Sequence, residues 1–129
     1  MFRLSNVLRI NAASCLTFGA AFAIAPATVA TFLGADAAAP TTVLRVLGGV
    51  LIINGLHLLW AAMMKAPARW LIVWFSGGDF AWVIGSLAVL ASGQWVTTAA
   101  GIAVTLAVAA FVAVLGAMQL YACPRTARQ

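Results

Sequence analysis

A few polar side chains lie inside otherwise apolar stretches of the sequence, and any chemistry would depend on them. They are Asn54, His57, Ser76, Asp79 and Thr105. A charged aspartate at the centre of a membrane helix costs about 2.5–3.5 kcal/mol on insertion scales, so it turns inward, pairs or becomes protonated. A histidine near an aspartate can relay protons, because both titrate near neutrality when their environments differ.

The spacing of four of these residues predicts one buried polar cluster. Asn54 and His57 are three residues apart and share a helix face. In an antiparallel hairpin that turns near residues 66–67, residues whose numbers add to about 133 share a depth. Asp79 then lies level with Asn54, and Ser76 lies level with His57. We expect these four side chains to meet where the second and third apolar segments pack.

Glycines near the predicted cluster favour a close helix contact. Gly55 lies between Asn54 and His57, and Gly77 and Gly78 directly precede Asp79. Small residues allow membrane helices to approach and to form hydrogen bonds across the contact. We therefore expect these glycines at the interface between the two segments.

Three interpretations of the cluster stay open at this point. In the first, the polar groups satisfy one another and fix the helix register. In the second, Asp79 and His57 mark a path for protons, ions or a ligand. In the third, His57 ligates a metal, haem or pigment, although a single histidine is a small ligand set. We expect no metal site, no cofactor and no catalytic residue, and the protonation state of Asp79 is left open.

Composition sets the fold class. Hydrophobic residues make up 65% of the 129 residues and charged residues 7%, whereas a soluble domain carries about 25% charged residues. So few charges cannot cover the surface of a soluble globule, and so apolar a chain is not disordered. The composition excludes a soluble enzyme and predicts an all-α membrane protein.

The apolar residues fall into four segments long enough to cross a membrane. They cover residues 8–30, 42–64, 70–91 and 95–121, and a spanning helix needs about 20 residues. Short turns between them make neighbouring helices antiparallel, so the chain forms one four-helix domain over residues 1–129. Pro26 can bend or end the first segment. Its start resembles a signal peptide, and we expect it to be retained as the first helix.

The basic residues predict the orientation. Six of them fall on one side of the bundle, and only Arg45 falls toward the other; the six are Arg3, Arg9, Lys65, Arg69, Arg125 and Arg128. The positive-inside rule then places both termini in the cytoplasm. We expect the membrane to be the inner membrane of a bacterium. It also explains the net charge of +5 without nucleic-acid binding. Five residues are expected to act as interfacial anchors: Arg45, Trp60, Trp70, Trp74 and Trp95.

The two cysteines predict no redox or metal chemistry. Cys15 and Cys123 are widely spaced and form no Cys-x-x-Cys motif. Both lie toward the predicted cytoplasmic side, where thiols stay reduced. We expect Cys15 to be a small packing residue and Cys123 to belong to the tail.

Several short motifs resemble those of small bacterial four-helix membrane proteins of the DoxX-like superfamily. They are Arg45-Val-Leu-Gly-Gly, Asn54-Gly-Leu-His, Asp79-Phe-Ala-Trp and Gly85-Ser86. The resemblance implies a four-helix bundle of the inner membrane, in a group sometimes associated with redox or quinone-linked systems. It implies no catalytic residue for this chain.

These observations favour a non-enzymatic accessory or assembly subunit of a larger membrane complex. The expected partners are the lipid bilayer and other transmembrane subunits or further copies of the chain. One alternative is a small oligomeric transporter or channel that uses Asp79 and His57. A second alternative, which the resemblance implies, is a redox or quinone-linked membrane component.

Overall fold

The computed structural model describes residues 4–65 and 67–122, and this part of the chain is helical with no strand. Its elements are α1 (Leu4–Ile24), α2 (Pro26–Gly34), the short 3-10 helix η1 (Ala35–Ala37), α3 (Thr41–Ala62), α4 (Arg69–Ser92) and α5 (Ala99–Ala122). Four of them, α1, α3, α4 and α5, have 21 to 24 residues and are apolar enough to cross a membrane. The structure thus indicates an integral membrane protein.

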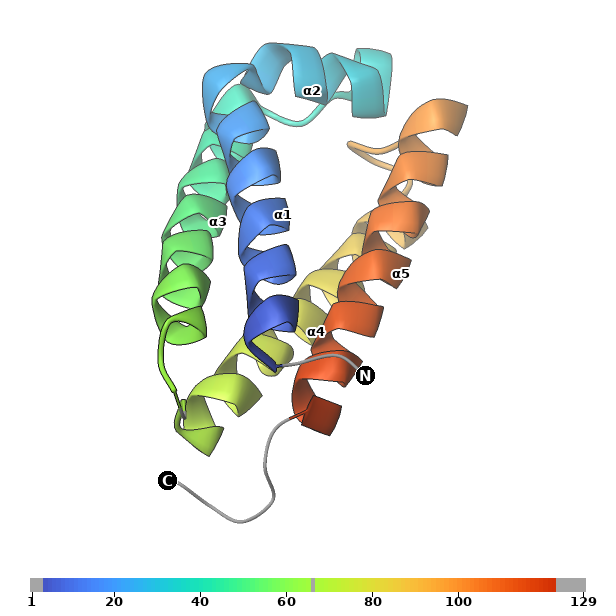
Figure 1. Cartoon of the computed structure of the whole chain (residues 1–129). Coiled ribbons are helices and arrows are strands. Elements are labelled where there is room, and N and C mark those ends of the chain that lie inside the picture. Colours follow the sequence, from blue (N-terminus) through green and yellow to red (C-terminus); the bar gives the residue numbers. More distant parts are fainter. Residues whose placement is uncertain (1–3, 66, 123–129) are drawn as a thin grey trace.

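The first predicted segment, residues 8–30, forms two helices rather than one. The proline at position 26 has no N–H and takes the first position of α2, where a helix tolerates it. Ala25 interrupts the helical conformation between α1 and α2, with a ψ of 55°. Figure 1 shows α2 lying across the end of α1 instead of continuing it.

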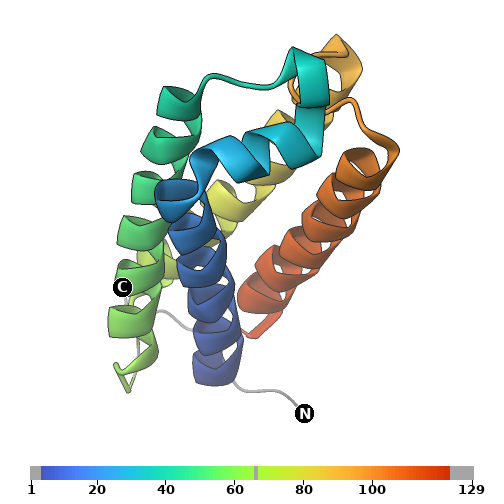
Figure 2. The same cartoon turned by 90° about the horizontal axis from the view of Figure 1, so that it is seen from above.

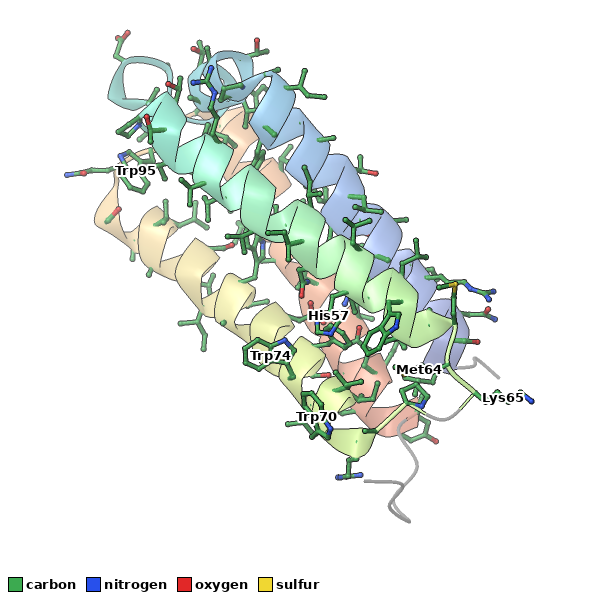
Figure 3. All side chains as sticks on the ribbon, turned by 90° about the vertical axis from the view of Figure 1, so that its left-hand side faces the viewer. His57, Met64, Lys65, Trp70, Trp74 and Trp95 are labelled. Atoms are coloured by element: carbon green, nitrogen blue, oxygen red, sulfur yellow. The ribbon has the colours of Figure 1, made fainter. Side chains whose placement is uncertain are left out.

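The four long helices alternate in direction and pair two by two. The helix α1 packs along α3, and α4 packs along α5, as both Figure 1 and Figure 2 show. One end of the molecule holds the start of α1, the end of α3, the start of α4 and the end of α5 (Figure 1). Lys65 follows α3 and lies at this end (Figure 3). We call it the Lys65 end. The opposite end carries α2, η1 and the start of α3.

Glycines allow α1 and α3 to touch backbone to backbone. A Cβ atom on Gly48 would lie 2.8 Å from the Ala23 nitrogen and 2.8 Å from the Gly19 oxygen. One on Gly55 would lie 2.8 Å from Leu16 Cγ. Such small residues let membrane helices pack without a hydrophobic driving force. The α1–α3 pair therefore depends on glycine at these positions.

Neighbouring glycines on α3 provide a matched test of this contact. A Cβ on Gly48 meets backbone atoms, whereas one on Gly49 meets nothing within 4 Å. We expect Gly48→Ala to lower the free energy of unfolding by about 1–2 kcal/mol, because the backbones must separate. Gly49→Ala is expected to be neutral or slightly stabilising, since alanine favours a helix. Unfolding in micelles titrated with a denaturing detergent measures the free energy of unfolding of both variants. Equal effects of the two substitutions would contradict a close α1–α3 contact at Gly48.

An apolar core at the Lys65 end joins the two pairs of helices. It combines side chains of α1, α3 and α4: Leu8, Ala12, Cys15, Leu58, Ala61, Ala62, Leu71, Ile72 and Phe75. Leu8, Leu58 and Ile72 have no exposed surface. Away from this end, the backbones of α3 and α4 hardly approach one another.

Two threonines join α5 to α2 at the opposite end. The backbone N–H groups of Thr97 and Thr98 donate hydrogen bonds to the Leu33 oxygen, at 2.8 and 3.1 Å. The Thr97 hydroxyl donates to the Gly34 oxygen at 3.0 Å. Carbonyl groups at a helix end have no partner within the helix, so the segment before α5 satisfies the end of α2.

The same threonines set the start of the last helix. It was expected near residue 95, but α5 begins at Ala99. The Gly101 N–H donates to the Thr98 hydroxyl oxygen at 2.9 Å, which is the bond of an N-cap residue. The predicted residues Arg3, Cys123, Arg125 and Arg128 lie outside the described part of the chain.

Candidate functional site: a buried polar network

Asp79 lies at the centre of a polar network that joins α1, α4 and α5. It is ten residues past the start of α4, or about 15 Å along the axis at 1.5 Å per residue, near the middle of that helix. Its exposed fraction is 5%. The carboxylate therefore faces the interior of the bundle and not the lipid.

Two amide side chains hold the Asp79 carboxylate. Asn11 Nδ2 donates to both oxygens, at 3.2 Å to Oδ1 and 2.9 Å to Oδ2. Gln119 Nε2 donates to Oδ2 at 3.1 Å. Both amides are buried, with exposed fractions of 1% and 0%. Bonds to a charged acceptor are stronger than those between neutral groups, so this set fixes α1 and α5 on α4.

The two amides also bind one another. Asn11 Nδ2 donates to Gln119 Oε1 at 2.6 Å. An amide nitrogen carries two N–H groups, and that of Asn11 serves three acceptors, so one N–H is shared. Each amide thus contacts both the carboxylate and the other amide, which makes the three side chains a closed triad. We call Asn11, Asp79 and Gln119 the polar triad.

Ser76 extends the triad to the backbone of α5. Its hydroxyl donates to the Gly116 oxygen at 3.0 Å and accepts from Gln119 Nε2 at 3.1 Å. Gly116 makes this contact possible, because a Cβ there would lie 3.2 Å from Asp79 Cβ and 3.2 Å from Phe80 Cζ. A side chain at this position would therefore crowd α4, although less tightly than a side chain at Gly48 would crowd the backbone of α1.

Asn54 joins the network only at its edge, through Cys15. Asn54 Nδ2 donates to Cys15 Sγ at 3.5 Å, and the thiol donates to Asn11 Oδ1 at 3.7 Å. Asn54 therefore points toward α1, and no direct bond to Asp79 is present among the described residues. Of the four residues predicted to meet, the structure joins Ser76 and Asp79 through Gln119 and connects Asn54 indirectly.

His57 lies apart from the polar triad and makes aromatic contacts instead. Its ring stacks on Trp60, with centroids 5.4 Å apart, and meets the edge of Phe75 at 5.0 Å. Within the described residues it forms no hydrogen bond with Asp79. The Phe75 contact places the His57 ring beside the residue that precedes Ser76 on α4.

The network is internally satisfied. Within residues 4–65 and 67–122, no buried side-chain nitrogen or oxygen lacks a hydrogen-bond partner. The bonds to Asp79 use its oxygens only as acceptors of N–H groups, as expected for a carboxylate. In the same part of the chain no group of three metal-ligating side chains is present. The arrangement can hold helices together and can keep a charge inside the bundle.

Sequence reasoning missed two of the triad residues. Asn11 lies near the start of the first apolar segment and Gln119 near the end of the last one. A polar residue at such a position is easily interpreted as part of the membrane boundary. The signal that could have found them is chemical, because Asn11, Asn54 and Gln119 are the amides within these segments. An inward aspartate needs donors, and amides are uncharged donors that hydrocarbon tolerates better than lysine or arginine.

Two of the glycines expected at the cluster do not mediate a contact. Gly77 and Gly78 are exposed, and a Cβ on either would meet nothing within 4 Å. They precede Asp79 in sequence, but the turn of the helix places them on the exposed side of α4. Gly55 does mediate a close contact, with α1 rather than with α4.

The predicted interfacial anchors divide between the two ends. Trp60, Trp70 and Trp74 are exposed near the Lys65 end, whereas Arg45 and Trp95 are exposed toward the other end. Figure 3 shows Trp70 and Trp74 on α4, with Trp95 far from both. Exposed indole rings at both ends of a bundle suit the two membrane interfaces.

Comparison with known proteins finds no relative. No family model, no curated protein and no solved structure matches the chain.

Proposed function

We propose that the protein is a non-enzymatic accessory or assembly subunit of a larger membrane complex. It binds a transmembrane helix of a partner through the outer face of α4. The basic residues favour a bacterial inner membrane and an orientation with both termini in the cytoplasm. Arg9, Lys65 and Arg69 lie toward the Lys65 end, whereas Arg45 lies near the start of α3 at the opposite end.

The observation that carries the proposal is a face of small residues on α4. It consists of Gly77, Gly78, Ala81, Gly85 and Ala88, which are all exposed. A Cβ on any of the three glycines would meet nothing within 4 Å, so packing within the chain does not require glycine there. Glycine costs about 1 kcal/mol against alanine inside a helix. Small residues at this spacing let a second membrane helix approach closely.

The buried network supports the same function. Among the described residues, its buried polar side chains all have hydrogen-bond partners. A bundle fixed in this way presents a rigid α4 to a partner. The proposal therefore places the function on the outer face of α4.

The proposal predicts a complex that depends on the small-residue face. The chain, extracted from its native membrane in mild detergent, is expected to migrate with a partner, well above its own 13.3 kDa. Gly77→Leu combined with Gly85→Leu is expected to release the free subunit, because the larger side chains hold the partner helix away. Native electrophoresis with mass spectrometry of the bands measures this.

Gly49→Leu is the matched control, since Gly49 also has open space around it but lies on α3. It is expected to leave the complex intact. A wild-type chain that migrates alone would contradict the proposal. A complex made only of copies of this chain would also contradict an accessory subunit and would favour a homo-oligomer.

The two alternative functions stay predictions. A transporter or channel has the buried Asp79 in its favour, but its other proposed residue, His57, lies on Trp60 and Phe75. A redox or quinone-linked component has only the resemblance in its favour. Proton flux into vesicles that contain the purified protein, compared with Asp79→Asn, tests the first alternative.

A further inference from the structure

We propose that α2 and η1 form a strap that opens and closes over the end of the bundle opposite the Lys65 end. Figure 1 and Figure 2 show the strap closed, crossing from the end of α1 to the segment that leads into α5. In the open state its fastening to that segment is broken, while the rest of the bundle keeps its packing. The inference goes beyond the proposed function and does not rest on it.

Both ends of the strap are joints at which regular structure is interrupted. Pro26 lacks the N–H that would continue the hydrogen bonds of α1, and Ala25 has a ψ of 55°. After η1, Ala38 is extended, with a φ of −61° and a ψ of 147°, and Pro40 leads into α3. The strap can therefore turn about both joints without unwinding α1 or α3.

The face that α2 packs against the bundle is small. Its buried residues are Pro26, Ala30 and Gly34, one on each successive turn, and none is larger than proline. Its largest side chain, Phe32, is 48% exposed. Because the attraction between packed groups grows with the number of atoms in contact, this face holds α2 only weakly. The closed state therefore depends on the bonds at the far end of α2.

Those bonds come from the two threonines before α5, and they lie at the edge of the molecule. Besides the backbone bonds to the Leu33 oxygen, the Thr98 hydroxyl donates to the Phe32 oxygen at 2.7 Å, in an exposed position. Carbonyl groups at an exposed helix end bind water when another partner leaves. Opening the strap is therefore less costly than breaking the buried polar triad, whose groups would stay unpaired.

The closed state holds two backbone conformations that are unfavourable for residues with a side chain. Ala35 has a φ of 48° and a ψ of −114°, and Trp95 has a φ of 69°. The Val96 N–H donates to the Gln94 oxygen at 2.8 Å, which with the positive φ of Trp95 makes a γ-turn of the rare, strained kind. Among the described residues, Ala35 and Trp95 are the two non-glycine residues with positive φ.

The two strained residues meet at one contact between the strap and the segment before α5. Gly34 directly precedes Ala35, and a Cβ on Gly34 would collide with the Trp95 oxygen and lie 2.9 Å from its carbonyl carbon. Strain of this kind persists only where surrounding contacts impose it, and it gathers at clamps and switches. Opening releases the strain and closing restores the hydrogen bonds, so the two states are balanced. A partner that binds one state better would shift this balance.

Fluorine NMR of the full chain labelled with fluorotryptophan, in lipid nanodiscs, tests the strap. Trp95 is expected to show a second, minor state, seen as a separate signal or by relaxation dispersion. Trp82 packs on Phe22 of α1, with centroids 6.5 Å apart, and lies one turn beyond the polar triad. Trp70 begins α4 at the Lys65 end. Both are expected to show one state, because the bundle below the strap does not change.

A matched pair of alanine-to-glycine substitutions isolates the strain. Ala35→Gly is expected to raise the ratio of closed to open strap roughly tenfold, the factor that corresponds to the penalty for positive φ in a residue with a side chain. Ala38→Gly is the control, because its φ of −61° is favourable for any residue, and it is expected not to raise the ratio. Gly34→Ala is expected to make the open state predominant, since the added methyl group collides with the Trp95 backbone.

Several results would overturn the inference. One is a single Trp95 state in the wild type and in Gly34→Ala. Another is an equal effect of the two glycine substitutions on the ratio. A third is a second state of Trp70 and Trp82 with the same population as that of Trp95, which would indicate a change of the whole bundle. Unchanged Trp70 and Trp82 signals in Gly34→Ala show that this variant is folded.

Discussion

Replacing Asn11 with leucine is expected to lower the free energy of unfolding by roughly 3 kcal/mol. The substitution removes the amide that donates to both Asp79 oxygens and to Gln119 Oε1. A single hydrogen bond in a membrane protein contributes only about 0.6 kcal/mol on average. The larger loss is expected because, among the described residues, the buried carboxylate keeps one donor, Gln119 Nε2.

Asn6→Leu is the matched control for this prediction. Asn6 lies on the same helix but is exposed, so its replacement is expected to change the free energy of unfolding by less than about 0.5 kcal/mol. Both variants are measured in micelles titrated with a denaturing detergent. Equal effects at the two positions would show that the triad contributes nothing particular to stability.

Replacing Gly116 with valine is the second large effect that we expect, also roughly 3 kcal/mol. The first added carbon already lies 3.2 Å from Asp79 Cβ, and valine adds two methyl groups beyond it. The helices α4 and α5 must therefore separate. That movement breaks the 3.0 Å bond from Ser76 to the Gly116 oxygen and loosens Gln119.

Ala117→Val tests whether this loss is specific to the contact. Ala117 follows Gly116 on α5 but is exposed, so the larger side chain meets lipid and little destabilisation is expected. The same denaturing titration, with helix content followed by circular dichroism, compares the two. Gly116→Val with wild-type stability would contradict the close α4–α5 contact.

Hydropathy predicted much of the fold because it depends on each segment alone. A run of about 20 apolar residues is sufficient to indicate a spanning helix, and the four spans agree with α1, α3, α4 and α5. The break at Pro26 also followed from local chemistry, because proline cannot continue the preceding helix. The crossing helix α2 was not predicted, since its nine residues are as apolar as the span before them.

The site was harder to predict, because it depends on how each helix is rotated about its axis. Gly48 contacts α1 and Gly49 does not, although one residue separates them. Asn54 was expected to meet Asp79, but its side chain donates to Cys15 on α1. A depth comparison between two segments adjacent in sequence could not include Asn11, which comes from α1. An inward Asp79 was predictable, and its partners were not.

The polar triad also bears on the proposed function. By joining α1 to α4 and α5 it fixes the helix whose outer face carries the exposed glycines. A variant that loosens the triad is therefore expected to weaken the complex as well as the bundle. Loss of the complex without loss of stability is expected only for substitutions on the small-residue face.

A double-mutant cycle between Asn11 and Asp79 tests the central claim most directly. The free energies of unfolding of the wild type, Asn11→Leu, Asp79→Leu and the double variant give the energy that couples the two side chains. We predict a coupling of more than about 1 kcal/mol, above the average for one hydrogen bond in a membrane protein. Additive losses, within about 0.5 kcal/mol, would contradict a structure in which these residues hold the helices together.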